Sequence, residues 1–144
     1  MEIVIHHNPE CGTSRNVLAI IEAANYKPYI VDYLKTGWSE PQLRALFAAA
    51  GITAREALRL TKSPAVELGL DNLTVSNDKL IEMMLRYPVL VNRPIVCSHK
   101  GVRLCRPSER VIDLLERLPR GPFYKEDGSL LVDENGHLVN GVKV

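Results

Sequence analysis

The chain has 144 residues, of which 46% are hydrophobic and 24% charged, with 18 lysines and arginines against 17 aspartates and glutamates. This composition excludes a disordered chain, collagen and a coiled coil, and the length fits one globular domain. A net charge of +1 argues against a general role on nucleic acid or on a membrane surface, since such proteins usually carry a clear basic excess. Three cysteines are too few for a disulfide scaffold, and we expect no secretory signal, no membrane helix and a cytoplasmic location.

The first third of the chain reads as strand, helix, strand. The predicted elements are a strand at 2–6, a loop at 8–13, a helix that begins at Ser14 as its cap, and a second strand at 27–34. Apolar residues from Val17 to Ala24 recur at helical spacing, which gives the helix one buried face. Short crossovers of this kind favour parallel pairing of the two strands.

A helical block follows. Ser39 and Pro41 predict a helix start and Gly51 its end, and Ser76 caps a longer helix that runs to Arg86 before Pro88. Two short helices are expected between them, at 53–60 and 63–68.

The last part reads as strand, strand, helix. Paired strands are expected at 89–96 and 102–105, joined through residues 99–101, and an amphipathic helix at 108–118. Residues 121–144 are Gly-rich with two turn signals, and they read as a tail, either a loose hairpin or a disordered end. The order predicts an α/β fold on the thioredoxin plan: residues 1–120 form one catalytic domain whose mixed sheet is flanked by helices, with a helical insertion at about 39–87.

Cys11 is the residue that carries chemistry. It lies between the first strand and the first helix, where unsatisfied N–H groups and the positive end of the helix dipole favour the thiolate. His7 and Arg15 are near enough in sequence to add charge or hydrogen bonds. Ser14 stands where a dithiol oxidoreductase has its second cysteine, so Cys11 needs a thiol from outside.

Several blocks in order resemble the glutaredoxin-coupled arsenate reductases. They are His7-Asn8-Pro9-Glu10-Cys11-Gly12-Thr13-Ser14-Arg15-Asn16, Arg55-Glu-Ala-Leu-Arg59, Asn92-Arg93-Pro94-Ile95-Val96, Leu104-Cys105-Arg106-Pro107-Ser108-Glu109 and Lys125-Glu126-Asp127-Gly128. The resemblance covers about residues 2–136, nearly the whole chain.

The resemblance implies a thiol–arsenate adduct on Cys11, reduction by glutathione as cosubstrate with no bound cofactor, and glutaredoxin as the partner that regenerates the enzyme. It implies that Arg59, Arg93 and Arg106 bind the oxyanion, that His7 tunes the thiolate, and that Pro94 follows a cis peptide bond. The residues assigned a supporting role are Asn8, Gly12, Thr13, Ser14, Arg15 and Pro94. An arsenic-resistance enzyme of this kind would act as a monomer, without nucleic acid, membrane or metal.

Charge supports the assignment independently. Arsenate is a tetrahedral, mostly doubly charged anion, and guanidinium groups match its paired oxygens. Arg93 and Arg106 fall at the start of one candidate strand and just after the next, so they lie either at the Cys11 end of the sheet or at the opposite end. Arg59 competes with Arg55 for its role, and each arginine also has a reading as an ordinary surface ion pair.

Cys97 and Cys105 would face each other across a turn centred on Gly101, but two ordinary buried thiols are the favoured reading. Two related anion chemistries are excluded by motif: Val17 stands where a phosphatase loop needs arginine, and no Gly-rich phosphate loop is present. The alternatives left open are a thioredoxin-like regulator that binds RNA polymerase and responds to thiol stress, and a reductase of another oxyanion.

Overall fold

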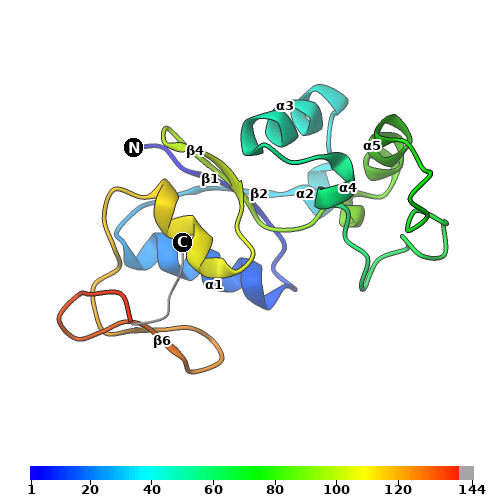
Figure 1. The fold of residues 1–144 in the computed structure, drawn as a ribbon. Coiled ribbons are helices and arrows are strands. Elements are labelled where there is room, and N and C mark those ends of the chain that lie inside the picture. The colour runs from blue at the N-terminus through cyan, green and yellow to red at the C-terminus, as the bar shows by residue number, and fades with distance from the viewer. Residues whose placement is uncertain (140–144) are drawn as a thin grey trace. The chain divides into compact units, whose positions relative to one another are not determined.

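The computed structural model describes residues 1–139 (Figure 1) and divides the chain into two compact units. Unit 1 consists of Met1–Asp32 with Arg93–Val144, and unit 2 is Tyr33–Asn92. The last five residues of the predicted tail, 140–144, lie outside the described residues. None of the helices within residues 1–139 has the length and apolar character that crossing a bilayer requires.

Unit 1 is built on a four-stranded mixed sheet. The strand order is β2-β1-β3-β4, with β1 parallel to β2 and β3 antiparallel to both of its neighbours. The α/β class and the parallel pairing of the first two strands are thereby confirmed. The elements are β1 (Val4–His7), α1 (Gly12–Ala23), β2 (Tyr29–Asp32), β3 (Ile95–Ser98), β4 (Gly101–Leu104), the 3-10 helix η2 (Ser108–Leu114), β5 (Phe123–Tyr124) and β6 (Leu130–Val132).

The core of unit 1 lies where α1 and η2 pack against each other and against the sheet. Figure 1 shows η2, the yellow coil, beside α1. The helical spacing predicted for the first helix supplies its share of this core, and β5 and β6 pair antiparallel and add two fully buried side chains. The buried cluster includes Ile3, Ile5, Val17, Ile20, Ile21, Val111, Leu114, Leu131 and Val132.

Several predicted boundaries in unit 1 are wrong. The first helix begins at Gly12 with Cys11 as its N-cap, so Ser14 lies inside its first turn. The strand expected at 89–96 begins only at Ile95, as β3. Pro88 starts a 3-10 turn, and Pro94, which has no N–H for the ladder, directly precedes the strand. The last predicted helix is the shorter, tighter η2, and the second strand is shorter than 27–34.

The turn between β3 and β4 also differs from the prediction. Cys97 pairs with Val102, and Ser98 with Gly101, so the turn residues are His99 and Lys100. Gly101 has φ +141°, a conformation that side-chain-bearing residues rarely adopt. Cys105 therefore does not face Cys97; its N–H donates to Pro94 O at 2.9 Å.

Unit 2 is helical. Its elements are α2 (Tyr33–Thr36), α3 (Glu40–Ala50), α4 (Ala54–Ala57), α5 (Asn77–Arg86) and the 3-10 helix η1 (Pro88–Leu90). Both predicted helix starts are confirmed. Ser39 forms a capping box with Gln42 ahead of α3, which ends at Gly51 in the left-handed conformation (φ +68°), and Ser76 caps α5.

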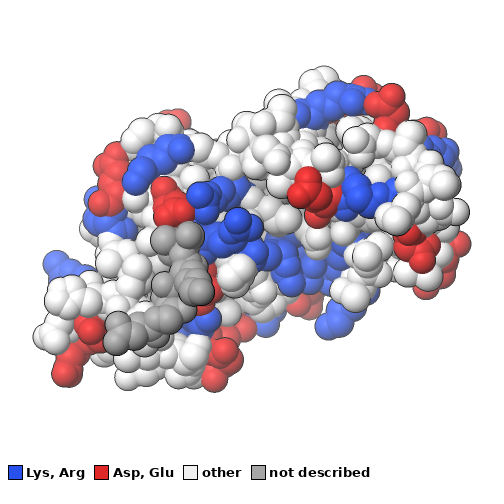
Figure 2. Space-filling view, viewed as in Figure 1, with Lys and Arg blue, Asp and Glu red and all other residues white. Residues whose placement is uncertain are grey.

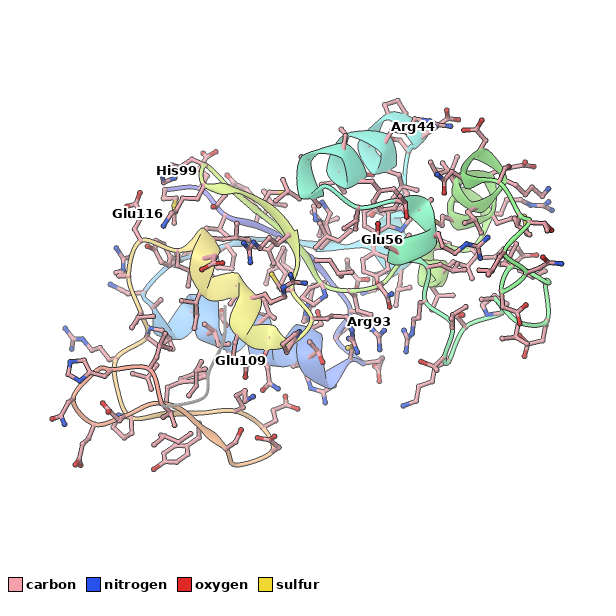
Figure 3. All side chains as sticks on the ribbon, viewed as in Figure 1. Arg44, Glu56, Arg93, His99, Glu109 and Glu116 are labelled. Atoms are coloured by element: carbon pink, nitrogen blue, oxygen red, sulfur yellow. The ribbon has the colours of Figure 1, made fainter. Side chains whose placement is uncertain are left out.

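The two short helices predicted inside this block are mostly wrong. Only Ala54–Ala57 is helical at the first, where Thr53 and Glu56 form a second capping box (Glu56 is labelled in Figure 3). The backbone becomes extended at Leu58, which forms an isolated antiparallel bridge with Val91. Residues 63–68 form turns.

Candidate active site

Cys11 occupies the N-cap of α1, directly after the loop that follows β1. Its backbone is extended (φ −103°, ψ 123°), and its N–H donates to Asn8 O at 3.1 Å, which closes the loop into a turn. The side chain is 6% exposed. With a cap at Ser14 the thiol would lie three positions before the cap; as the N-cap itself it lies beside the N–H groups of the first helical turn.

These surroundings make the thiol acidic. Burial raises the pKa of Cys11, but the N–H of Ser14, the charge and hydrogen bond of Arg93, and the N–H of Thr13 together hold it below the ordinary value. Although the sulfur accepts no capping hydrogen bond of standard geometry, the electrostatic effect of the two N–H groups remains. A lowered pKa gives more thiolate at neutral pH, and thiolate is the nucleophilic form.

The sheet topology brings Arg93 and Arg106 to the same end as Cys11. Because β3 runs antiparallel to β1, Ile95 at its start pairs with His6 near the end of β1, and the end of β4 lies beside the start of β3. Arg106 Nη1 lies 3.7 Å from Cys11 Sγ and donates to Arg93 O at 3.2 Å. Arg93 is 8% exposed and lies at the entry to β3 (Figure 3). Of the two ends that the sequence left open, the structure selects the end with the thiol.

The peptide bond between Arg93 and Pro94 is cis, as the resemblance implied. The bonds that precede Pro107 and Pro122 are also cis, which the sequence did not indicate.

Ser14 organises the loop from the inside. Its Oγ accepts the N–H of Asn8 at 3.1 Å and lies 2.6 Å from His7 Nδ1. Both contacts are satisfied when Ser14 donates its proton to a neutral His7. Burial lowers the pKa of His7, and Asp32 offsets this in part, so the imidazole is neutral at neutral pH. His7 therefore meets the site through a hydrogen bond to Ser14 rather than through a positive charge.

The remaining supporting residues surround the same turn. Asn8 Oδ1 accepts the N–H of Glu10 at 2.9 Å. Thr13 contributes its backbone N–H, whereas Arg15 reaches back to Pro9 O at 2.8 Å and pairs with Glu126. A Cβ on Gly12 would meet Arg15 Nη2 and Glu126 Oε1 at ordinary contact distances of 3.7 and 3.8 Å.

Arg59 belongs to unit 2. It is buried, its Nε donates to Thr61 O at 2.8 Å, and its backbone N–H donates to Leu90 O at 2.7 Å. Arg55, the other candidate for this role, donates hydrogen bonds to three backbone carbonyls, those of Leu70, Asn72 and Val75. Arg55 thus holds that loop, and the role of Arg59 toward an oxyanion stays a prediction.

Sequence reasoning missed Glu126. Glu126 lies in the segment 125–128 that resembles the family, but the sequence indicates no role for its side chain. Its contact with Arg15 joins positions 111 residues apart. No local pattern could have shown such a contact.

The other two cysteines differ chemically from Cys11. Burial raises the pKa of Cys105 to about 12 and also raises that of Cys97. Cys97 pairs with Val4, at the end of β1 remote from the Cys11 loop. All three cysteines are free. Within residues 1–139, no group of three or more histidine, cysteine or acidic side chains could hold a metal ion.

A thiolate flanked by two guanidinium groups suits covalent attack on a small anion. Comparison with known proteins shows which family the chain is similar to. The ArsC family model matches residues 6–114. The chain is 62% identical to arsenate reductase ArsI2 of Synechocystis sp. over 95% of this chain and 98% of the relative, and 47% identical to the arsenate reductase of Escherichia coli K12 over 93% and 95%.

Solved structures give the same answer for the fold. The arsenate reductase from Vibrio cholerae is 35% identical and superposes with a TM-score of 0.75, covering 80% of this chain and 98% of that one. Sequence and structure together place the chain, with its Cys11 loop and its mixed sheet, in the ArsC family of thioredoxin-like arsenate reductases.

Proposed function

We propose that this chain reduces arsenate to arsenite with Cys11 as the nucleophile. The observation that carries the proposal is the acidified Cys11 sulfur in contact with Arg106 and beside Arg93. The relatives named arsenate reductase, matched over almost the full length of both chains, support the same substrate.

The arginines answer the main difficulty of the reaction. A thiolate that approaches doubly charged arsenate meets strong repulsion, and fixed positive charge at the site offsets it as charge develops in the transition state. Arg93 and Arg106 supply that charge beside the sulfur, with forked geometry that fits two oxygens of a tetrahedral anion. Arg59 is the third proposed ligand. His7 positions Ser14, whose N–H faces the thiolate.

The proposed reaction has three steps. Cys11 attacks arsenic, an S–As bond forms, and one arsenate oxygen leaves as water after protonation. A glutathione thiolate then attacks the Cys11 sulfur; the S–S bond forms, and the S–As electron pair stays on arsenic, which leaves as arsenite. A glutaredoxin thiolate finally attacks the glutathione sulfur, and Cys11 is released as the thiol.

The need for an external reductant follows from the thiols. Cys97 lies at the opposite end of the sheet, Cys105 is fully buried with its pKa raised to about 12, and the residue three after Cys11 is Ser14. Glutathione as cosubstrate, glutaredoxin as partner, a monomer and a cytoplasmic location are parts of this proposal.

The test is a coupled assay in which NADPH oxidation is followed with glutathione reductase, glutathione and glutaredoxin. We expect NADPH oxidation that depends on arsenate and disappears in Cys11→Ser. The matched control is Cys97→Ser, which should retain activity because that thiol lies away from the site.

Three results would overturn the proposal. Full activity in Cys11→Ser would remove the nucleophile. Turnover that needs no arsenate, or that another oxyanion supports better, would favour a different substrate. A chain that lacks arsenate-dependent turnover but binds RNA polymerase would favour the regulator instead.

A further inference from the structure

A carboxylate from the C-terminal hairpin grips the start of the active-site helix. Glu126 lies in the turn between β5 and β6, and its two oxygens accept hydrogen bonds from Arg15 Nε at 2.8 Å and Nη2 at 3.0 Å. The third guanidinium nitrogen, Nη1, donates to Pro9 O at 2.8 Å. The backbone N–H of Glu126 donates to Asn16 Oδ1 at 2.9 Å. We call these four contacts the Glu126 clasp.

The hairpin that carries Glu126 is itself anchored. Lys125 forms a partly buried ion pair with Glu109 at the start of η2 (Glu109 is labelled in Figure 3). On the strand that follows, Leu131 and Val132 are fully buried in the core of unit 1. Glu126 therefore projects from a fixed support rather than from a free end.

The clasp acts on the loop that presents the thiol. Pro9 O is held from the outside by Arg15, whereas Asn8 is held from the inside by Ser14. Cys11 lies between these two attachments and α1. The pKa of its thiol depends on its position relative to the N–H groups of Thr13 and Ser14.

Stability alone does not account for the clasp. Arg15 and Glu126 are 44% and 48% exposed, and ion pairs at that exposure contribute little to folding. A bidentate fork does, however, fix geometry, and the position of a nucleophile within a fraction of an ångström affects its rate strongly.

We propose that Glu126 is a positioning residue for the reaction: by clasping Arg15 and Asn16 it holds the Pro9–Cys11 turn in the geometry that keeps the thiolate ready to attack. This deepens the proposed function and rests on it for the substrate. The clasp itself concerns only how Cys11 is presented.

The experiment compares Glu126→Ala and Glu126→Gln with Asp113→Asn. Asp113 makes a similarly exposed ion pair with Arg103 at 2.8 Å between η2 and β4, so this variant removes an equivalent pair away from the loop. Four quantities are measured. They are the rate of Cys11 alkylation by iodoacetamide at neutral pH, resolved by peptide mass spectrometry, kcat and KM for arsenate, and Tm.

We expect Glu126→Ala to slow Cys11 alkylation by about three- to tenfold and to lower kcat more than it changes KM. Its Tm should fall no further than that of Asp113→Asn. Glu126→Gln keeps one acceptor for the fork and should lie between Glu126→Ala and the native chain. The effects of Arg15→Ala and Glu126→Ala should be less than additive in the double variant, because both remove the same contact.

Alkylation and kcat in Glu126→Ala equal to those of Asp113→Asn would overturn the proposal. If the alanine variant does not fold, Glu126→Gln is compared with Asp113→Asn in the same way, and the same result decides. Alkylation needs no arsenate, so a native chain without arsenate turnover would refute the proposed function while the alkylation rates still test the clasp.

Discussion

Ser14 connects three parts of the site. Its hydroxyl meets His7 and Asn8, and its N–H faces the Cys11 sulfur. The residue is fully buried, so loss of the hydroxyl leaves two buried polar groups without their partner. The serine that replaces the second cysteine of a dithiol motif is therefore a structural part of the loop.

We expect Ser14→Ala to lower the free energy of unfolding by about 1–3 kcal/mol and to reduce Cys11 alkylation, because the loop loses its inner attachment. Urea unfolding and peptide-resolved alkylation measure the two effects. The control is Thr13→Ala, which retains the backbone N–H that acts on Cys11. Equal losses in the two variants would contradict a specific role for the Ser14 hydroxyl.

Arg93 governs the acidity of the thiol more directly than any other side chain, through both charge and a hydrogen bond. We expect Arg93→Ala to raise the pKa of Cys11. Alkylation of the native chain should increase as pH rises through the lowered pKa and then level off, and the variant's curve should lie at higher pH. Arg103→Ala, which breaks only an exposed pair with Asp113, should leave the curve in place. An unshifted curve in Arg93→Ala would remove this arginine from the site's electrostatics.

Residue types near Cys11 could be read from sequence because the nucleophile and its first neighbours are contiguous. The position of Arg106 could not, because it depends on the antiparallel register of β3 and β4. The structural role of Arg55 was equally hidden, since its guanidinium meets the backbone carbonyls of residues 15 to 20 positions further along the chain.

At the scale of elements, helix starts with clear caps were predicted well, whereas the ends of short elements were not. Ser39 and Ser76 combine a good capping residue with a following polar first turn, and both helices begin there. Cys11 is an unusual N-cap, so sequence rules favoured Ser14 and moved the start of α1 into its first turn. Short elements such as α4 depend on bridges like Leu58 with Val91, which propensity does not report.

Arg55 connects α4 to the segment that precedes α5. We expect Arg55→Ala to lower the free energy of unfolding by about 1–3 kcal/mol, because three carbonyls lose a charged donor. Proteolysis should become faster in residues 60–75. Arg44→Ala, which breaks two exposed ion pairs (Arg44 is labelled in Figure 3), should change stability by less than about 0.5 kcal/mol. The same small effect in both variants would show that Arg55 does not pin this segment.

On the scale of the whole molecule, the composition predicts nearly equal numbers of acidic and basic side chains on the surface. Acidic and basic side chains both occur over the visible face (Figure 2), in keeping with a net charge of +1. The order of elements was likewise sufficient for the fold class. The share of the C-terminal hairpin in the core of unit 1 was not predicted, because the turn signals at 127–128 and 135–136 say nothing about which surface Leu131 covers.

The three thiols should report on folding differently. Burial holds the pKa of Cys105 near 12, so the folded chain keeps this proton above the pH at which an unfolded thiol loses it. Stability contributed by this difference is full below the ordinary thiol pKa and declines as pH rises toward about 12. Urea unfolding of Cys105→Ala between pH 9 and 11 should therefore show a weaker decline than the native chain. Parallel declines would contradict the linkage.

The same burial predicts the order of labelling. Under native conditions iodoacetamide should modify Cys11 first and Cys97 slowly, with Cys105 reacting only as the chain unfolds in urea. Modification of Cys105 before the unfolding transition would contradict its sealed position.

Two of the groups that acidify Cys11 belong to the main chain, at Thr13 and Ser14. Ordinary substitutions at these positions exchange the side chain and leave the amide where it was. This part of the lowering of the Cys11 pKa therefore depends on the course of the backbone and persists when the side chains at these two positions change. To raise the pKa of the Cys11 thiol through these groups, an ester linkage would have to replace the amide at position 13 or 14, because the ester removes the N–H donor and keeps the side chain.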